Sequence, residues 1–246
     1  MPQSGAIRPM SKAEAIVQHV VGLIRDGEYG PGDRLPSERL LQEDLGVGRL
    51  SLREGLARLS ALGVIRIEHG KGAFVQAKAS SHSLAYAMTP CFSERDQRSM
   101  EDLVHTREVI EGELSGLAAQ CRQEGDIQKL EAILENPDIT HMDEEELADV
   151  DLAFHLEIAR VANNEFLEVM LTAIRTHIHS YLVHYVRAVN DPLLVVNRHW
   201  AILQAIIDQD PDQARQLARA HVKECKANIE SYVEARRKSI LSRVHS

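Results

Sequence analysis

The chain of 246 residues has few cysteines, few aromatic residues and no long apolar run, and these shortages exclude several classes of protein. Its three cysteines, Cys91, Cys121 and Cys225, lie far apart and form no CxxC pair, so neither a disulfide framework nor a Cys-based zinc or redox motif is expected. No segment approaches the roughly 20 apolar residues of a membrane helix, and the first residues lack a secretory signal. We expect a cytoplasmic protein with reduced core thiols and no membrane partner.

Positive charge is scarce overall but is concentrated near the N-terminus. The net charge is −9, yet residues 1–78 carry 11 Lys+Arg against 9 Asp+Glu, whereas the other 168 residues carry 17 against 28. Five basic residues lie between Arg49 and Lys71, against only Glu54 and Glu68. A local basic surface on an acidic chain can attract phosphate, so nucleic acid is a candidate partner.

The N-terminal residues predict three helices followed by a β-hairpin. Ser11 and Ser37 are helix-capping residues, and glycines at 27, 46 and 63 are expected to end the helices. The expected helices are 11–26, 37–45 and 49–62, and the expected strands are 64–68 and 73–76. This order is typical of a winged helix-turn-helix, although a purely structural α+β domain has the same order.

Residues 35–75 resemble the DNA-binding domain of the GntR family of bacterial transcription regulators. The match includes Leu35-Pro36-Ser37-Glu38-Arg39, Leu45-Gly46-Val47, Arg53-Glu54 and the glycines of the wing. The sequence departs from the family pattern at Gly48, Gly55 and Leu50, and Leu50 leaves the operator preference open.

The resemblance implies which residues contact a two-fold symmetric operator, the site expected for a homodimer. They are Arg39, Arg49, Ser51 and Arg53 from the helix-turn-helix and His69, Gly70 and Lys71 from the wing. Physical chemistry supports the assignment, since arginine can bind guanine through two hydrogen bonds and a helix N-terminus favours phosphate. The alternative is that Arg53 and Arg58 pair with carboxylates on a solvated face.

From residue 84 onward the pattern is helical, which predicts an all-α antiparallel bundle. The helices are expected at 99–123, 126–135, 143–162, 165–189, 193–208 and 212–244. The fold class is therefore mostly α. We expect a winged helix-turn-helix at residues 8–76, a linker at 77–83 and an all-helical domain at 84–240.

Four polar residues of this helical half form a candidate metal site. Asp151 and His155 are four residues apart, so both project from one face of one helix. His199 and His221 are equidistant from the turn expected at 208–212, so they should face each other on antiparallel helices. Three imidazoles and a carboxylate suit Zn, Ni or Mn, although four satisfied polar groups would have the same pattern.

Residues 99–235 resemble the FCD effector domain of the FadR subfamily of GntR regulators, in its metal-binding branch. The resemblance implies that Asp151, His155, His199 and His221 are metal ligands. It also implies that Arg107 faces a small carboxylate effector, and the alternative is a salt bridge to Glu108 or Glu111.

Three functions are compatible with these features. The first is a DNA-binding regulator, expected to be a repressor, whose helical domain binds a divalent metal and a small carboxylate. The second is the same kind of regulator with a purely structural metal and another effector, such as acyl-CoA. The third is a metal hydrolase, but the chain has no HExxH motif, and an enzyme leaves residues 35–75 unexplained. We expect the first and no enzymatic activity.

Overall fold

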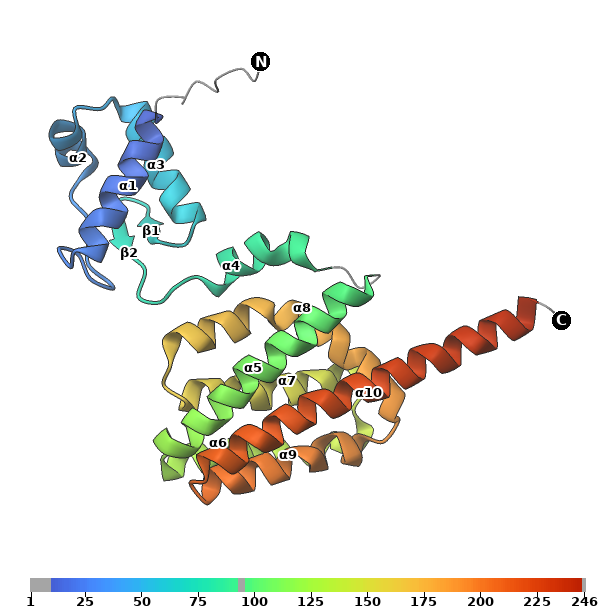
Figure 1. Cartoon of the computed structure of the whole chain (residues 1–246). Helices are drawn as coiled ribbons and strands as arrows, with labels where there is room; N and C mark the ends of the chain where they lie inside the picture. Colours follow the sequence, from blue (N-terminus) through green and yellow to red (C-terminus); the bar gives the residue numbers. More distant parts are fainter. Residues whose placement is uncertain (1–9, 93–95, 245–246) are drawn as a thin grey trace, which may run out of the picture. The chain divides into compact units, whose positions relative to one another are not determined.

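The computed structural model describes residues 10–92 and 96–244, without the side chains of residues 97 and 228–244. The chain divides after Ser83 into two compact units, each with its own hydrophobic core (Figure 1). Residues 8 and 9, which the sequence analysis includes in the DNA-binding domain, lie outside the described residues.

The N-terminal unit contains the three helices and the hairpin expected from the sequence. Its elements are α1 (Lys12–Arg25), α2 (Glu38–Leu45), α3 (Arg49–Ala61), β1 (Ile65–Glu68) and β2 (Gly72–Val75). Ser11 Oγ accepts a hydrogen bond from the Glu14 amide at 3.1 Å, and Ser37 Oγ accepts one from the Leu40 amide at 3.3 Å. The capping residues of the sequence therefore begin α1 and α2 as predicted.

The two strands form an antiparallel hairpin that carries the wing at its tip. Ile65 pairs with Val75 and Glu68 pairs with Gly72. Arg34, which precedes α2, forms a further bridge to Phe74 and extends the sheet beside β2. Gly70 and Gly72 have φ angles of 75° and 115°, which side chains rarely adopt, so the glycines allow the tight reversal.

Gly55 of α3 packs closely against α1. A Cβ atom at Gly55 would lie 2.7 Å from Ile16 Cγ2 and 3.2 Å from the carbonyl oxygen of Ala13. Gly55 is one of the positions where the sequence departs from the family pattern. Because it has no side chain, α1 and α3 can pack tightly. Ile16 fills the space and is 1% exposed.

Replacing Gly55 by alanine is expected to destabilise the N-terminal unit. Alanine favours a helix by about 1 kcal/mol over glycine, but overpacking a core costs about 1–3 kcal/mol, and Ile16 Cβ has little freedom to move. Gly22→Ala in α1 is the matched control, because a Cβ there meets nothing within 4 Å. Thermal unfolding should show a lower midpoint for Gly55→Ala and an equal or higher one for Gly22→Ala; equal shifts would contradict the packing argument.

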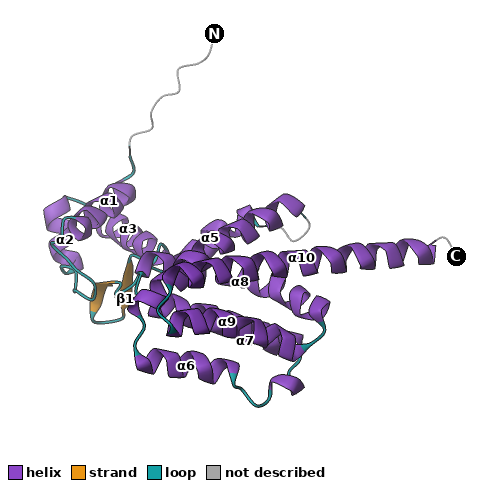
Figure 2. Cartoon of the chain, turned by 60° about the horizontal axis from the view of Figure 1, so that its bottom comes forward, coloured by secondary structure: helices purple, strands orange, loops and turns teal. Residues whose placement is uncertain are grey.

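The C-terminal unit is an all-helical bundle, and strands occur only in the N-terminal unit among the described residues (Figure 2). Helices α5 and α10 pack side by side, and α7 packs on α8 (Figure 1). After α4 (Ser81–Met88), which begins three residues before the division, the α-helices are α5 (Gln97–Cys121), α6 (Glu124–Leu134), α7 (Glu144–Val161), α8 (Glu165–Val189), α9 (Pro192–Ile207) and α10 (Pro211–Val244). Two short 3-10 helices lie at Thr89–Cys91 and Ile139–His141. The mostly α fold class predicted from the sequence is confirmed.

Helix α4 begins inside residues 77–83, the segment that the sequence analysis assigns to a linker. Ser80 Oγ accepts a hydrogen bond from the Ser83 amide at 3.2 Å, which caps the first turn. None of the residues of α4 is buried, so the apolar periodicity that marks the other helices is absent here.

The expectation of core thiols is wrong for two of the three cysteines. All three are free, but Cys91 and Cys121 are exposed and only Cys225 is buried. Cys91 and Cys121 lie at the ends of their helices, where a small apolar residue does not have to be buried.

None of the helices that the structure describes has both the length and the apolar character that a membrane-spanning segment needs.

Candidate metal centre

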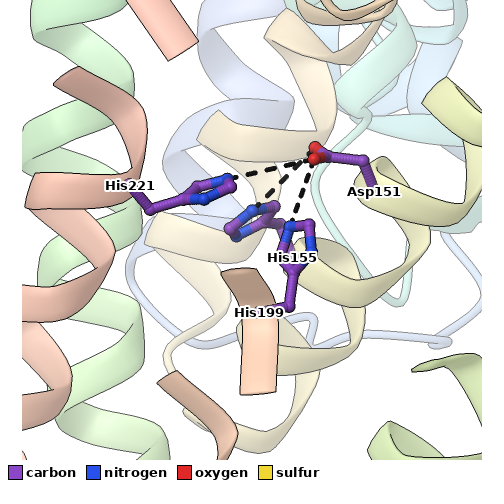
Figure 3. A group of neighbouring side chains, drawn as sticks. All are labelled: Asp151, His155, His199 and His221. Carbon is purple, nitrogen blue, oxygen red and sulfur yellow. Dashed lines mark ion pairs between the residues drawn. The ribbon is translucent and has the colours of Figure 1, made fainter. Parts of the chain in front are cut away.

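Three helices bring four buried polar side chains together inside the C-terminal bundle (Figure 3). Asp151 and His155 come from α7, His199 from α9 and His221 from α10. One potential ligand atom from each residue lies within 4.8 Å of all the others, and every side chain is at most 5% exposed. The arrangement is a compact cluster of one carboxylate and three imidazoles.

The local sequence accounts for this convergence. Asp151 and His155 are one helical turn apart, and their side chains point to the same side of α7 (Figure 3). Helix α9 ends at Ile207 and α10 begins at Pro211, so the turn lies midway between His199 and His221. Their ring centroids are 4.6 Å apart, which confirms the prediction that the two imidazoles meet.

The polar atoms of the cluster lie close together, and most of them have no hydrogen-bond partner. Asp151 Oδ1 lies 3.1 Å from His199 Nε2 and 3.9 Å from His221 Nε2, and Asp151 Oδ2 lies 4.0 Å from His155 Nε2. Among the described residues, both oxygens of Asp151 and at least one ring nitrogen of each histidine have no hydrogen-bond partner of acceptable geometry. Buried polar atoms without partners are costly, and a divalent cation would be a partner for the carboxylate and for one ring nitrogen of each histidine. The donor set therefore fits a metal ion.

The other histidines of α8 differ from the cluster because each has a neighbour of its own. The ring of His177 stacks on Phe92 with centroids 4.2 Å apart, and His179 Nε2 lies 3.2 Å from Asp149 Oδ1. His184 Nδ1 hydrogen-bonds with the carbonyl oxygen of Ser180 at 2.8 Å. These contacts agree with leaving the three histidines out of the metal site.

Burial favours the neutral form of two of the three histidines, which is the form that binds metal. It lowers the pKa of His155 and of His221, and it outweighs the nearby carboxylates, which act to raise both pKa values. Burial acts to raise the pKa of Asp151, but the facing histidines outweigh it and hold that pKa below its ordinary value. Neutral imidazoles and an ionised carboxylate are the forms that bind a cation.

Glu111 of α5 contacts the cluster from outside, and sequence reasoning did not assign it to the site. Its Oε2 lies 3.2 Å from His155 Nδ1, which directs His155 Nε2 toward the cluster. Its Oε1 accepts a hydrogen bond from Arg107 Nε at 2.7 Å. A carboxylate on the far nitrogen of a ligating histidine fixes the ring and its tautomer. The only signal in the sequence was the four-residue spacing of Arg107 and Glu111.

Arg107 is fully buried, and the structure gives it the ion pair that the sequence analysis weighed as an alternative. Burial acts to lower the pKa of Arg107, but Glu111 outweighs it, so the guanidinium stays charged. The pair leaves Arg107 Nη1 buried without a hydrogen-bond partner among the described residues. The salt bridge is therefore compatible with an effector role, because Arg107 Nη1 can still donate a hydrogen bond to a ligand.

Cys225 lies one turn after His221, with its Sγ atom 3.7 Å from His221 Nε2. Burial raises the pKa of this thiol, so it is protonated near neutral pH. Since the thiolate is the form that binds metal, we do not count Cys225 among the ligands.

The residues expected to contact DNA all lie in the N-terminal unit, and all but half-buried Ser51 are exposed. Arg49 is the first residue of α3, and His69, Gly70 and Lys71 form the tip of the hairpin. Arg39 donates two hydrogen bonds to Glu43, at 2.6 and 2.8 Å, and Lys71 Nζ lies 3.2 Å from Glu68 Oε2. Exposed pairs of this kind contribute little stability, so phosphate can replace the carboxylates at small cost.

Arg49 and Arg53 differ from Arg58 on the same helix. Arg58 pairs with Glu54 at 2.7 Å and with Glu14 at 3.6 Å, so for Arg58 the solvated ion pair is what the structure has. Arg49 and Arg53 form no ion pair with any residue that the structure describes.

A winged helix-turn-helix joined in one chain to a helical domain with a buried polar cluster is the organisation of a ligand-responsive transcription regulator. The chain belongs to the GntR family of bacterial regulatory proteins, whose model matches residues 12–75, and residues 102–224 match the FCD domain. The resemblances to the GntR DNA-binding domain and to the FCD domain are thus confirmed.

Relatives along most of the chain are regulators too. The Glc operon transcriptional activator of Escherichia coli strain K12 is 30% identical over 88% of each chain. The regulator LutR of Bacillus subtilis is 26% identical over 86% of this chain and 98% of its own. The solved structure of Streptococcus agalactiae GntR shares the fold with a TM-score of 0.63, at 24% identity over 86% of this chain and 97% of that one. These relatives are regulators and not enzymes, which excludes the hydrolase.

Proposed function

We propose that this regulator binds a two-fold symmetric operator as a homodimer and releases or rearranges it when a small carboxylate binds. Residues 8–76 would contact DNA through the seven residues named above, residues 77–83 would link the domains, and residues 84–240 would hold the effector. A protein that acts on chromosomal DNA works in the cytoplasm. Dimeric helix-turn-helix proteins bind paired half-sites, which supports this arrangement.

The observation that carries the proposal is the set of unpartnered buried atoms in the C-terminal bundle. Asp151, His155, His199 and His221 would hold a divalent metal, with zinc our first choice and nickel or manganese as alternatives. When bound, the ion supplies a Lewis-acidic position for an oxygen of the effector. Arg107 Nη1 would donate to the effector carboxylate, while Glu111 holds the guanidinium and the His155 ring in place.

The names of relatives suggest which carboxylates to test. One relative, 28% identical over 88% of this chain, is named a putative L-lactate dehydrogenase operon regulatory protein of Escherichia coli. Lactate is a small carboxylate with a neighbouring hydroxyl, which can offer two oxygens to a metal and one carboxylate edge to arginine. We propose lactate, glycolate and pyruvate as the first effectors to test, with sugar acids and dicarboxylates after them.

The effector can act only through a difference in affinity for two conformations. If it binds more tightly to the form with the wrong half-site spacing, it weakens DNA binding, which is how the effector of a repressor would act. We propose repression, as in the relative named transcriptional repressor NanR of Klebsiella aerogenes, which is 27% identical over 89% of this chain.

The thermal midpoint of the protein should rise with one small carboxylate, and only when metal is present. A ligand that binds the folded state stabilises it by about 2.7 kcal/mol at a hundredfold excess over its dissociation constant. The measurement is a melt of the full chain against a carboxylate panel, with chelator and with added zinc. A thermal midpoint that rises with zinc but with no carboxylate would instead support a purely structural ion. A midpoint that does not respond to zinc or chelator would refute the metal site.

A further inference from the structure

Besides the imidazoles, three buried ionised groups lie in the C-terminal bundle among the described residues. They are Arg107, Glu111 and Asp151, and all three are at most 2% exposed. Glu111 joins Arg107 to His155, and His155 and His199 adjoin Asp151. The three charges therefore belong to one continuous buried cluster with the candidate metal ligands.

The charges of this cluster do not cancel when a divalent metal is bound. Arginine stays protonated, a carboxylate paired with arginine or with a cation is ionised, and imidazoles that bind metal are neutral. One positive group, two negative groups and a divalent cation together give the loaded cluster a charge of +1. An uncompensated buried charge is unfavourable, so the loaded centre lacks one negative charge.

The neighbouring ionised groups do not supply that charge. Arg198, next to His199, donates to Tyr185 Oη at 2.7 Å and pairs with Glu224 at 2.8 Å, so this cation is already balanced. Arg107 Nη1, by contrast, is buried and has no hydrogen-bond partner among the described residues, although Glu111 occupies Nε and lies near Nη2. An anionic ligand that supplies the missing negative charge could therefore accept a hydrogen bond from Arg107 Nη1.

We infer that the metal-loaded centre selects ligands with a single negative charge, monocarboxylates over dicarboxylates, and that Glu111 sets this selectivity. The inference rests on the proposed function, because it assumes a carboxylate effector beside a metal. A monocarboxylate brings the buried charge to zero, whereas a dicarboxylate leaves an extra negative charge in the bundle. Glu111 acts as a positioning residue: it supplies one of the two internal negative charges and orients both Arg107 and His155.

The test compares acids that differ in one carboxylate, using zinc-loaded full-length protein and titration calorimetry. The pairs are lactate with tartronate and 2-hydroxybutyrate with malate, and zinc content is checked after each titration. In the wild type the monocarboxylate of each pair should bind at least about tenfold more tightly, the ratio that 1.4 kcal/mol of charge imbalance produces. Glu111→Gln raises the loaded charge to +2, so the preference should shift by about tenfold toward the dicarboxylate.

Glu113→Gln is the matched control on the same helix. Glu113 is partly exposed and pairs with Arg215 and Arg219 outside the cluster, so its replacement should leave the ratio unchanged. If the wild type binds the dicarboxylate of a pair as tightly as the monocarboxylate, or more tightly, this inference alone is overturned, whether or not Glu111→Gln retains zinc. A zinc-loaded wild type that binds no carboxylate of either charge would instead overturn the proposed function.

Discussion

Replacing His199 by alanine is expected to abolish tight metal binding and with it the response to the effector. His199 is 1% exposed, and its Nε2 is the nitrogen nearest to Asp151, at 3.1 Å. Loss of an outer partner of a metal ligand lowers affinity by about 10–100-fold, so loss of a ligand itself should exceed about 100-fold. The measurement is zinc content and zinc affinity of the purified variant, together with its carboxylate-dependent melt.

DNA binding separates this effect from general unfolding. The substitution lies in the C-terminal unit, so operator affinity without effector should stay close to that of the wild type. His179→Ala is the matched control, because His179 contacts Asp149 and lies outside the cluster, and zinc binding should be unchanged. Full metal content in His199→Ala would remove His199 from the proposed ligands.

Replacing Arg49 by alanine is expected to weaken operator binding by about 1–3 kcal/mol, which is roughly 5- to 150-fold. Arg49 is exposed at the first position of α3, where its guanidinium can reach two acceptors of a guanine. Lys71 at the wing should behave differently, because a lysine that contacts phosphate weakens binding to all sequences alike. Lys71→Ala should reduce the slope of affinity against salt by about one.

The measurement is fluorescence anisotropy with operator and with unrelated DNA over a range of salt concentrations. Arg58→Ala is the matched control on α3, since Arg58 already pairs with Glu54 and Glu14 and should affect affinity little. Equal losses for Arg49→Ala and Arg58→Ala would mean that only the general charge of the domain matters, and not base contacts from Arg49.

The geometry of the Asp/His cluster could be predicted from the sequence because every step depended on helix periodicity. Asp151 and His155 required only the four-residue spacing, and His199 and His221 required only the position of the turn. One proline, Pro211, and three aspartates marked that turn clearly. The helical bundle and the winged helix-turn-helix were predictable for the same reason, since regular apolar spacing and helix caps define them locally.

Contacts between helices that are distant in sequence could not be predicted in this way. Arg107 had carboxylates at both Glu108 and Glu111 within reach, and only the packing of α5 against α7 shows that Glu111 also meets His155. Helix α4 could not be predicted from apolar spacing, because none of its residues is buried. The exposure of Cys91 and Cys121 likewise depends on tertiary packing and not on composition.

The four proposed metal ligands are spread widely along the chain. Asp151 and His221 are 70 residues apart, and three helices contribute to the cluster. An ion bound by all four side chains would close that loop like a covalent cross-link, for which chain entropy alone gives about 4 kcal/mol. All three cysteines of the protein are free. The ion would thus act as a reversible cross-link, and its loss would weaken the packing of α7, α9 and α10 together.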